Sequence, residues 1–180
     1  SCTLKAKSDI EGSRVFTRAF ESHLAMGRPL TMITEPHPNY TFCCPDMLTD
    51  GIASEGPYNS GAYAGWYNKP MEVVIEMNGE SYNEVTLSTY ILKGDWIFGP
   101  KKIAVLTSAD GKVYTEIASQ VIEDNGLMKE GNGCQDFTLK FADTSEKHLK
   151  VIADTFTELP EWHPGAGHPG FLFVDEIVVK

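Results

Sequence analysis

The sequence predicts an all-β protein that is built from short strands around one apolar core. Three observations support this prediction: apolar and polar side chains alternate with a period of two, turn residues separate these segments, and no stretch has the period of an amphipathic helix. The chain has 180 residues, of which 42% are hydrophobic and 22% charged, so it can bury one sizeable core. Many short strands with regular turns are typical of a β-sandwich or a barrel.

The predicted strands follow one another along most of the chain. The alternating segments are Thr3–Ser8, Arg14–Ser22, Met71–Met77, Val85–Ile91, Ile103–Thr107, Val113–Thr115, Phe137–Phe141 and Leu149–Ala153. Asn78-Gly79 supplies a turn, and Ala109-Asp110-Gly111 predicts a hairpin. The last segment, Phe171–Val179, is almost continuously apolar, which predicts a central strand that is buried on both faces. Single helical turns are expected around Glu21–Met26 and Ser145–Lys147.

A domain boundary is expected near Ala25–Pro29. Two strands cannot form a stable domain alone, so we predict that residues 1–26 are the C-terminal strands of a preceding small β domain. Residues 27–180 then form the sandwich, with edge strands of the main domain as the alternative for the first segment. The N-terminus lacks the basic and apolar regions of a signal peptide, and we interpret it as a boundary inside a longer protein.

Charge and cysteine content exclude several classes of partner. The formal net charge of −10 disfavours nucleic acid and anionic membranes, and Lys101-Lys102 is the main basic cluster. No apolar stretch reaches the roughly 18 residues that a transmembrane helix needs. Four cysteines are too few for a disulfide framework and lack zinc-ligand spacing, so we interpret them as free thiols: Cys2, Cys43, Cys44 and Cys134. A neutral sugar is the kind of partner that best fits this acidic chain.

Catalytic motifs are missing from the sequence. It contains no G-x-S-x-G, no H-E-x-x-H and no glycine-rich phosphate loop, and most acidic residues alternate outward along strands. We therefore predict that this chain has no catalytic residues and needs no organic cofactor.

Two aromatic segments in Gly/Pro-rich loops predict a binding surface. The first, Leu159–Gly170, carries Trp162, His163 and His168, and the second, Gly94–Pro100, carries Trp96. The C–H face of a sugar ring suits the electron-rich face of an indole, and exposed aromatic clusters indicate contact with a ligand.

Trp162 with its two histidines is therefore the predicted sugar platform, with Trp96 and Tyr58 as second candidates. Three alternatives remain open. Trp162 could cap the sandwich, both histidines could hydrogen-bond within their own loop, and Trp96 could be partly buried. Trp66, by contrast, is expected to fill the core ahead of a strand.

A structural calcium ion is a further expectation. Asp50 lies in a turn, and Glu176 interrupts the apolar terminal strand. A buried carboxylate is costly unless it is paired or bound to a cation, and calcium takes carboxylate and carbonyl oxygens. An ordinary carboxylate that accepts hydrogen bonds from loop amides is the alternative.

An ordered set of segments resembles a known family. These segments are Leu48–Ile52, Trp66, Met71–Met77, Trp96–Pro100, Thr107–Lys112 and Phe171–Ile177. Together they are similar to a discoidin, or coagulation-factor type C, domain, and the match covers Gly27 to Lys180. Trp162–Gly167 with Phe173–Ile177 further resembles the C-terminal module of chitobiase-like β-N-acetylhexosaminidases, and Cys2–Leu24 resembles the small β domain that precedes that module.

The resemblance implies a galactose-binding-like jelly-roll sandwich with its ligand loops at one end and its termini at the other. It also implies a structural calcium near Asp50 and Glu176. We therefore expect a non-catalytic carbohydrate-binding module of a periplasmic, cell-surface or extracellular glycoside hydrolase. Its expected partners are a glycan that contains N-acetylhexosamine or galactose, and the catalytic domain of the parent enzyme. A structural or protein-interaction sandwich without a sugar ligand is the alternative.

Overall fold

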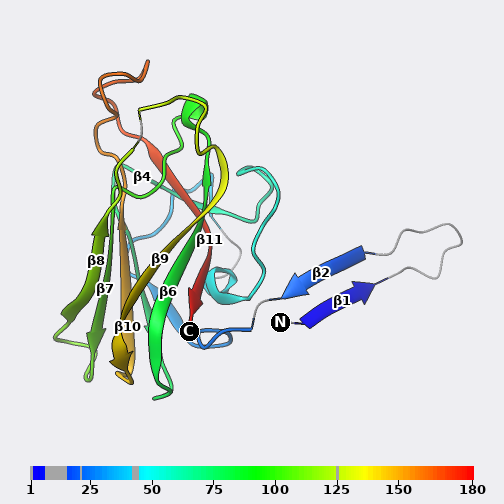
Figure 1. The fold of residues 1–180 in the computed structure, drawn as a ribbon, viewed down its shortest axis with the longest axis vertical. Coiled ribbons are helices and arrows are strands. Elements are labelled where there is room, and N and C mark those ends of the chain that lie inside the picture. Colours follow the sequence, from blue (N-terminus) through cyan, green and yellow to red (C-terminus); the bar gives the residue numbers. More distant parts are fainter. Residues whose placement is uncertain (1, 7–15, 21, 42–44, 125) are drawn as a thin grey trace, which may run out of the picture.

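Two antiparallel sheets pack face to face in the computed structural model, which describes residues 2–6, 16–20, 22–41, 45–124 and 126–180 (Figure 1). One sheet has the order β3 (Leu30–Met32), β5 (Met71–Glu76), β10 (His148–Asp154), β7 (Lys102–Ser108), β8 (Thr115–Val121). The other has the order β4 (Ala64–Tyr67), β11 (Phe171–Val179), β6 (Tyr82–Ile91), β9 (Gly133–Thr144). The predicted all-β sandwich is confirmed.

A separate hairpin precedes the sandwich. It consists of β1 (Cys2–Ala6) and β2 (Phe16–Phe20), which pair with each other, and it lies to one side in Figure 1. Two short 3₁₀ helices complete the secondary structure of the described segments, η1 (Pro45–Thr49) and η2 (Lys93–Asp95). Both helices were missed by the sequence analysis.

The core forms where the alternating strands face each other. β5 buries Met71, Val73 and Ile75 while the residues between them stay partly exposed, as a period of two requires. β11 lies between β4 and β6 and is buried along nearly its whole length, which confirms the predicted central strand. Trp66 is fully buried, and its indole N–H donates to the Thr34 carbonyl at 2.9 Å.

The turn prediction at residues 109–111 is confirmed. β7 and β8 pair as an antiparallel hairpin, in which Gly111 adopts a φ of +70°. Asp110 Oδ1 accepts hydrogen bonds from the amides of Lys112 and Val113, at 2.9 and 3.1 Å. These bonds hold the pKa of the Asp110 carboxyl below its ordinary value, with the Lys112 amide as the largest cause.

Three sequence expectations need correction. The short strands β3 and β4 were missed, and Trp66 lies within β4 instead of ahead of a strand. Residues 145–147 form no helical turn. Residues 24–27 form the single turn expected around Glu21–Met26, and residue 21 is outside the described segments.

The expected boundary at residue 26 also falls inside the sandwich. Ala25 is part of the main core, and the Leu24 amide bonds the Val179 carbonyl at 2.9 Å. The sandwich therefore includes residues before 27. The assignment of β1 and β2 to an upstream domain stays a prediction.

Three loops gather at one end of the sandwich. They join β6 to β7 (residues 92–101), β8 to β9 (residues 122–132, described except for 125) and β10 to β11 (residues 155–170), and they lie at the top of Figure 1. The C-terminus lies at the opposite end of the sandwich (Figure 1). None of the helices in the described segments is long and apolar enough to cross a membrane.

Candidate functional site

Two of these loops bring four of the five predicted binding residues together. The loop-end cluster consists of Trp96, Trp162, His163, His168 and the adjoining Lys93. The His163 ring centroid lies 6.0 Å from that of Trp96 and 5.6 Å from that of Trp162. Both indoles therefore pack against the same imidazole ring, each at a nearly perpendicular angle.

His163 itself is buried and has no free ring nitrogen. Its Nδ1 accepts a hydrogen bond from the Gly165 amide at 3.0 Å, so its Nε2 carries the proton and donates to the Lys93 carbonyl at 2.8 Å. The structure therefore does not support His163 as a ligand contact. For His163 the structure agrees with the alternative expectation, in which the histidine hydrogen-bonds within its own loop.

Trp96 is the exposed ring of the cluster. It follows η2 with a φ of +65°, and 36% of its surface is exposed. A Cβ added to Gly165 would lie 2.7 Å from Trp96 Cζ2, so the glycine backbone packs directly against the indole. The exposed His168 ring lies 5.8 Å away at an interplanar angle of 36°, and the two rings extend one aromatic surface.

Trp162 is half-buried and also packs against His163. Its ring centroid lies 6.1 Å from that of Phe98, and Lys93 Nζ lies 5.7 Å from the indole centroid. Gly126 of the β8–β9 loop lies beside this ring, because a Cβ built there would be in van der Waals contact with Trp162 Cδ1 at 3.7 Å. Trp162 therefore neither fills the core nor stands free.

Lys93 joins all three loops and was missed by the sequence analysis. The residue is 4% exposed, and its Nζ contacts Asp124 Oδ2 at 2.9 Å and the Leu127 carbonyl at 3.0 Å. Its carbonyl also accepts the His163 hydrogen bond. Lys93 further lines a pocket of about 160 Å³, whose wall combines apolar side chains, such as Ile122 and Phe156, with the carboxylates of Glu123, Asp124 and Glu130. A buried ammonium with these partners fixes the loop geometry around Trp162.

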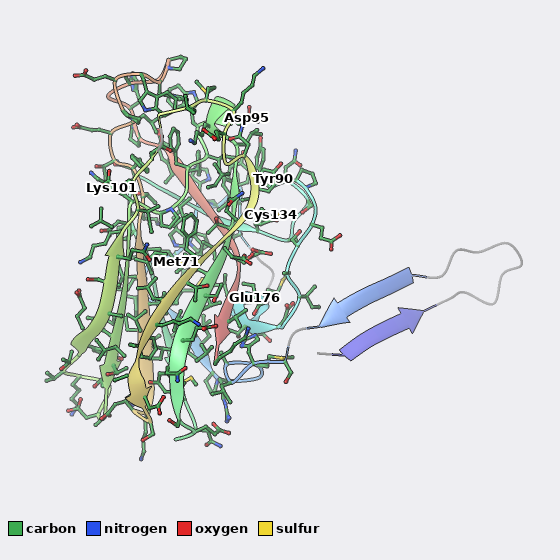
Figure 2. All side chains as sticks on the ribbon, viewed as in Figure 1. Met71, Tyr90, Asp95, Lys101, Cys134 and Glu176 are labelled. Atoms are coloured by element: carbon green, nitrogen blue, oxygen red, sulfur yellow. The ribbon has the colours of Figure 1, made fainter. Side chains whose placement is uncertain are left out.

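Tyr58, the fifth predicted residue, lies beside the cluster and contacts it through η2. Its hydroxyl donates to Asp95 Oδ2 at 3.3 Å, and its ring packs 5.1 Å from Phe173. Burial, followed by the charge of Asp95, raises the pKa of Tyr58 above its ordinary value. Figure 2 shows Asp95 at the loop end and Tyr90 close below it.

The two predicted calcium ligands, Asp50 in the turn and Glu176 on β11, share the Ile52 amide, but protein groups already satisfy Glu176. Its Oε1 lies 3.0 Å from His23 Nε2, and its Oε2 accepts from the amides of Gly51 and Ile52, both at 3.1 Å. Asp50 Oδ1 accepts from the same Ile52 amide at 2.8 Å.

Because N–H donors point at both oxygens of Glu176, these side chains do not fit a calcium site as arranged. No cluster of three His, Cys, Asp or Glu side chains suited to a metal occurs in the described segments. The calcium expected from the sequence stays untested, and from this arrangement we predict that none binds at Asp50 and Glu176.

Solved structures with the same fold include several carbohydrate-binding modules. One is a family 32 module from Clostridium perfringens in complex with GalNAc-β-1,3-galactose, with a TM-score of 0.52 and 23% identity over 88% of this chain and 99% of that one. Another is chitosan-binding module 1 of a chitosanase/glucanase from Paenibacillus sp. IK-5, with a TM-score of 0.52 and 13% identity over 89% of this chain and 99% of that module. A pectin-binding module gives a TM-score of 0.52 and 12% identity over 91% of each chain.

No protein-family model and no curated protein matches the sequence. The structural likeness nevertheless covers nearly the whole of each module named above, and it agrees with the two antiparallel sheets and their loop end. The chain therefore has the galactose-binding-like β-sandwich fold that these carbohydrate-binding modules share.

Proposed function

We propose that the chain is a non-catalytic carbohydrate-binding module that binds a glycan at the loop-end cluster. The observation that carries this proposal is that two tryptophans pack against one buried imidazole, with Trp96 and His168 open to solvent. A rigid aromatic surface of this kind loses little conformational entropy when a ligand binds.

The chemistry of the cluster suits a neutral sugar. The indole faces offer electron-rich surface to the C–H groups of a pyranose ring, and the His168 imidazole can exchange hydrogen bonds with hydroxyl groups. Lys93 is committed to Asp124 and Leu127, so it supports the surface instead of contacting the glycan. With few contacts on an open surface, affinity for a single sugar should be weak.

The parent protein is proposed to be a secreted or surface glycoside hydrolase, with a chitobiase-like β-N-acetylhexosaminidase as the specific candidate. In that setting the module would tether the catalytic domain to its substrate and raise the local concentration of both. The proposed ligand contains N-acetylhexosamine or galactose. The GalNAc-β-1,3-galactose bound by the Clostridium perfringens module supports this choice.

A glycan array of the purified chain, followed by calorimetric titration with the best ligand, tests the proposal. Trp162→Ala and Trp96→Ala should each weaken binding by about tenfold or more, as expected for central aromatic contacts. Tyr114→Ala is the matched control, because Tyr114 lies on the β7–β8 turn at the other end and packs on Lys150. If no glycan binds, or if both tryptophan variants bind like the control, a structural or protein-interaction role replaces the sugar-binding one.

A further inference from the structure

We propose that Asp95 determines the specificity of the glycan site, where it forms a second subsite together with the ring of Tyr58. This subsite takes a second, neutral sugar residue beside the one that stacks on Trp96, and it rejects sugars that carry a carboxylate. The inference rests on the proposed function, because it assigns a ligand class to the same end of the sandwich. Figure 2 shows Asp95 at this end, among the loops.

A closed turn holds Asp95 and Trp96 in fixed positions. Leu92 and Ile97 bond each other through both backbone amides, at 3.0 and 3.2 Å, and the Asp95 amide donates to the Leu92 carbonyl at 2.9 Å. β11 anchors the turn, because the Phe171 amide donates to the Trp96 carbonyl at 2.8 Å. These two adjacent residues are therefore positioned before a ligand arrives, which lowers the entropic cost of binding.

The Tyr58 side chain is joined to Asp95 and braced by other rings. Its hydroxyl donates to Asp95 Oδ2 at 3.3 Å, and burial, followed by the charge of Asp95, raises the pKa of this phenol, which therefore stays protonated. Its ring centroid lies 5.1 Å from that of Phe173, 6.1 Å from that of Tyr40 and 6.2 Å from that of Tyr90. Three rings thus fix an aromatic side chain that keeps part of its surface in solvent, where the C–H face of a sugar can pack on it.

The Asp95 carboxylate is exposed and has room for ligand hydroxyl groups. Among the residues that the structure describes, no lysine, arginine or histidine forms an ion pair with it. An ionised carboxylate offers about four lone-pair positions, of which the Tyr58 hydroxyl uses one. Hydroxyl groups of a sugar can donate to the others, and such charge-assisted hydrogen bonds are stronger than neutral ones.

Two aromatic residues adjoin this carboxylate, so the subsite can extend the first one. Trp96 follows Asp95 in the chain, and Tyr58 is hydrogen-bonded to it. Ile97, the next residue, belongs to the buried cluster against which the Tyr58 ring packs. A disaccharide can therefore place one sugar residue on each ring while its hydroxyl groups bond the carboxylate between them.

The charges around Asp95 select a neutral sugar. A ligand carboxylate would meet the Asp95 charge in a chain whose formal net charge is −10. The basic residue of the same turn, Lys93, is already committed to Asp124 and to the Leu127 carbonyl. Repulsion of this kind discriminates against a competing ligand without any added contact to the preferred one.

Calorimetric titration with three sugars tests the proposal. GalNAc-β-1,3-galactose should bind about tenfold more tightly than N-acetylgalactosamine alone, because the second residue gains the contacts with Tyr58 and Asp95. The third sugar is the same disaccharide with the primary alcohol of its galactose oxidised to a carboxylate. It should bind at least about tenfold more weakly than the neutral disaccharide, because like charges then lie close together.

Two variants and one control assign the effect to the subsite. Asp95→Asn keeps the size of the side chain, and it should weaken neutral disaccharide binding about tenfold and remove most of the discrimination against the oxidised one. Tyr58→Ala should lower the affinity for the disaccharide to that for N-acetylgalactosamine, and unchanged binding of the single sugar shows that the variant is folded. Asp143→Asn is the matched control, because Asp143 is also exposed and accepts a hydrogen bond from Asn83 at 2.7 Å, but at the far end of β9.

The outcomes separate this proposal from the proposed function. Equal affinities for the single sugar and the disaccharide would overturn the second subsite while leaving glycan binding intact. Discrimination against the oxidised disaccharide that survives Asp95→Asn would overturn the role of Asp95 in the same way. If none of the three sugars binds, the second subsite and the proposed ligand are both refuted.

Discussion

Replacing Lys93 with methionine tests whether one buried ammonium fixes the loop end. The substitution keeps most of the apolar stem but removes the Nζ contacts with Asp124 at 2.9 Å and with the Leu127 carbonyl at 3.0 Å. It also leaves the Asp124 carboxylate without this partner, in a side chain that is only 18% exposed.

The structure sets the size of the expected effect. Removing one partner of a fully buried pair costs about 3–5 kcal/mol, and partial exposure of Asp124 reduces this, so we expect a loss of about 2–3 kcal/mol. For a domain of this length, that loss lowers the Tm by about 5–10 °C. Because Trp162 packs beside Nζ, its fluorescence should change and glycan affinity should fall in parallel.

Urea unfolding and thermal melts measure the effect, and Lys140→Met is the matched control. Lys140 contacts Glu84 at 3.0 Å, a similar distance, but its side chain is 77% exposed, so its loss should cost less than about 0.5 kcal/mol. Adding Asp124→Asn to Lys93→Met should recover part of the stability, since the uncompensated charge is then gone. Equal effects of Lys93→Met and Lys140→Met would refute the assignment of Lys93 as the residue that joins the three loops.

Four further predictions concern the loop end, the turn, the buried carboxylate and calcium. Gly165→Ala places a Cβ 2.7 Å from Trp96 Cζ2, so it should displace the indole. The displacement should shift the tryptophan emission and weaken glycan binding. An unchanged emission spectrum would contradict the close packing of Gly165 and Trp96. Asp110→Ala should destabilise the chain at pH 7, because the ionised Asp110 carboxylate accepts the hydrogen bonds of the turn. The carboxyl loses this stabilising effect as the pH falls through its lowered pKa, so at lower pH the substitution should cost no stability. A carboxyl NMR titration with a midpoint at or above 3.8 would contradict the second prediction. His23→Ala should lower the free energy of unfolding by about 2–3 kcal/mol, because it leaves Glu176 Oε1 unpaired. Neither calcium nor a chelator should alter the Tm of the unsubstituted chain, and a rise in Tm with calcium would establish the metal site.

The sequence was sufficient for four strands of the two sheets. The segments that predicted β5, β7, β10 and β11 alternate or run apolar over at least five residues, and the bounds of these strands differ from the predicted ones by one residue or less. β3 has only three residues, and β4 follows a Gly- and Ser-rich loop, so neither has a period long enough to detect. They become strands because they pair with β5 and β11, and such pairing is a tertiary effect.

In the candidate site, too, the sequence predicted local features but not contacts between distant residues. The aromatic composition of residues 159–170 indicated a functional loop, because composition is a local property. The burial of His163 depends on a carbonyl 70 positions away in the chain, and the partner of Glu176 lies 153 positions away. Lys93 gave no local signal, since its partners come from loops whose approach only the folded chain determines.

The contrast between two tryptophans supports a ligand-binding role over a purely structural one. Trp66 is fully buried and uses its indole N–H inside the protein, as a residue that fills the core should. Trp96 adopts a left-handed backbone conformation, which costs a non-glycine residue roughly 1–2 kcal/mol, and yet it leaves 36% of its surface in solvent. This conformation ends η2, where the Trp96 amide donates to the Lys93 carbonyl at 3.0 Å, and the turn so formed holds the ring partly in solvent, where a stacking ligand can reach it.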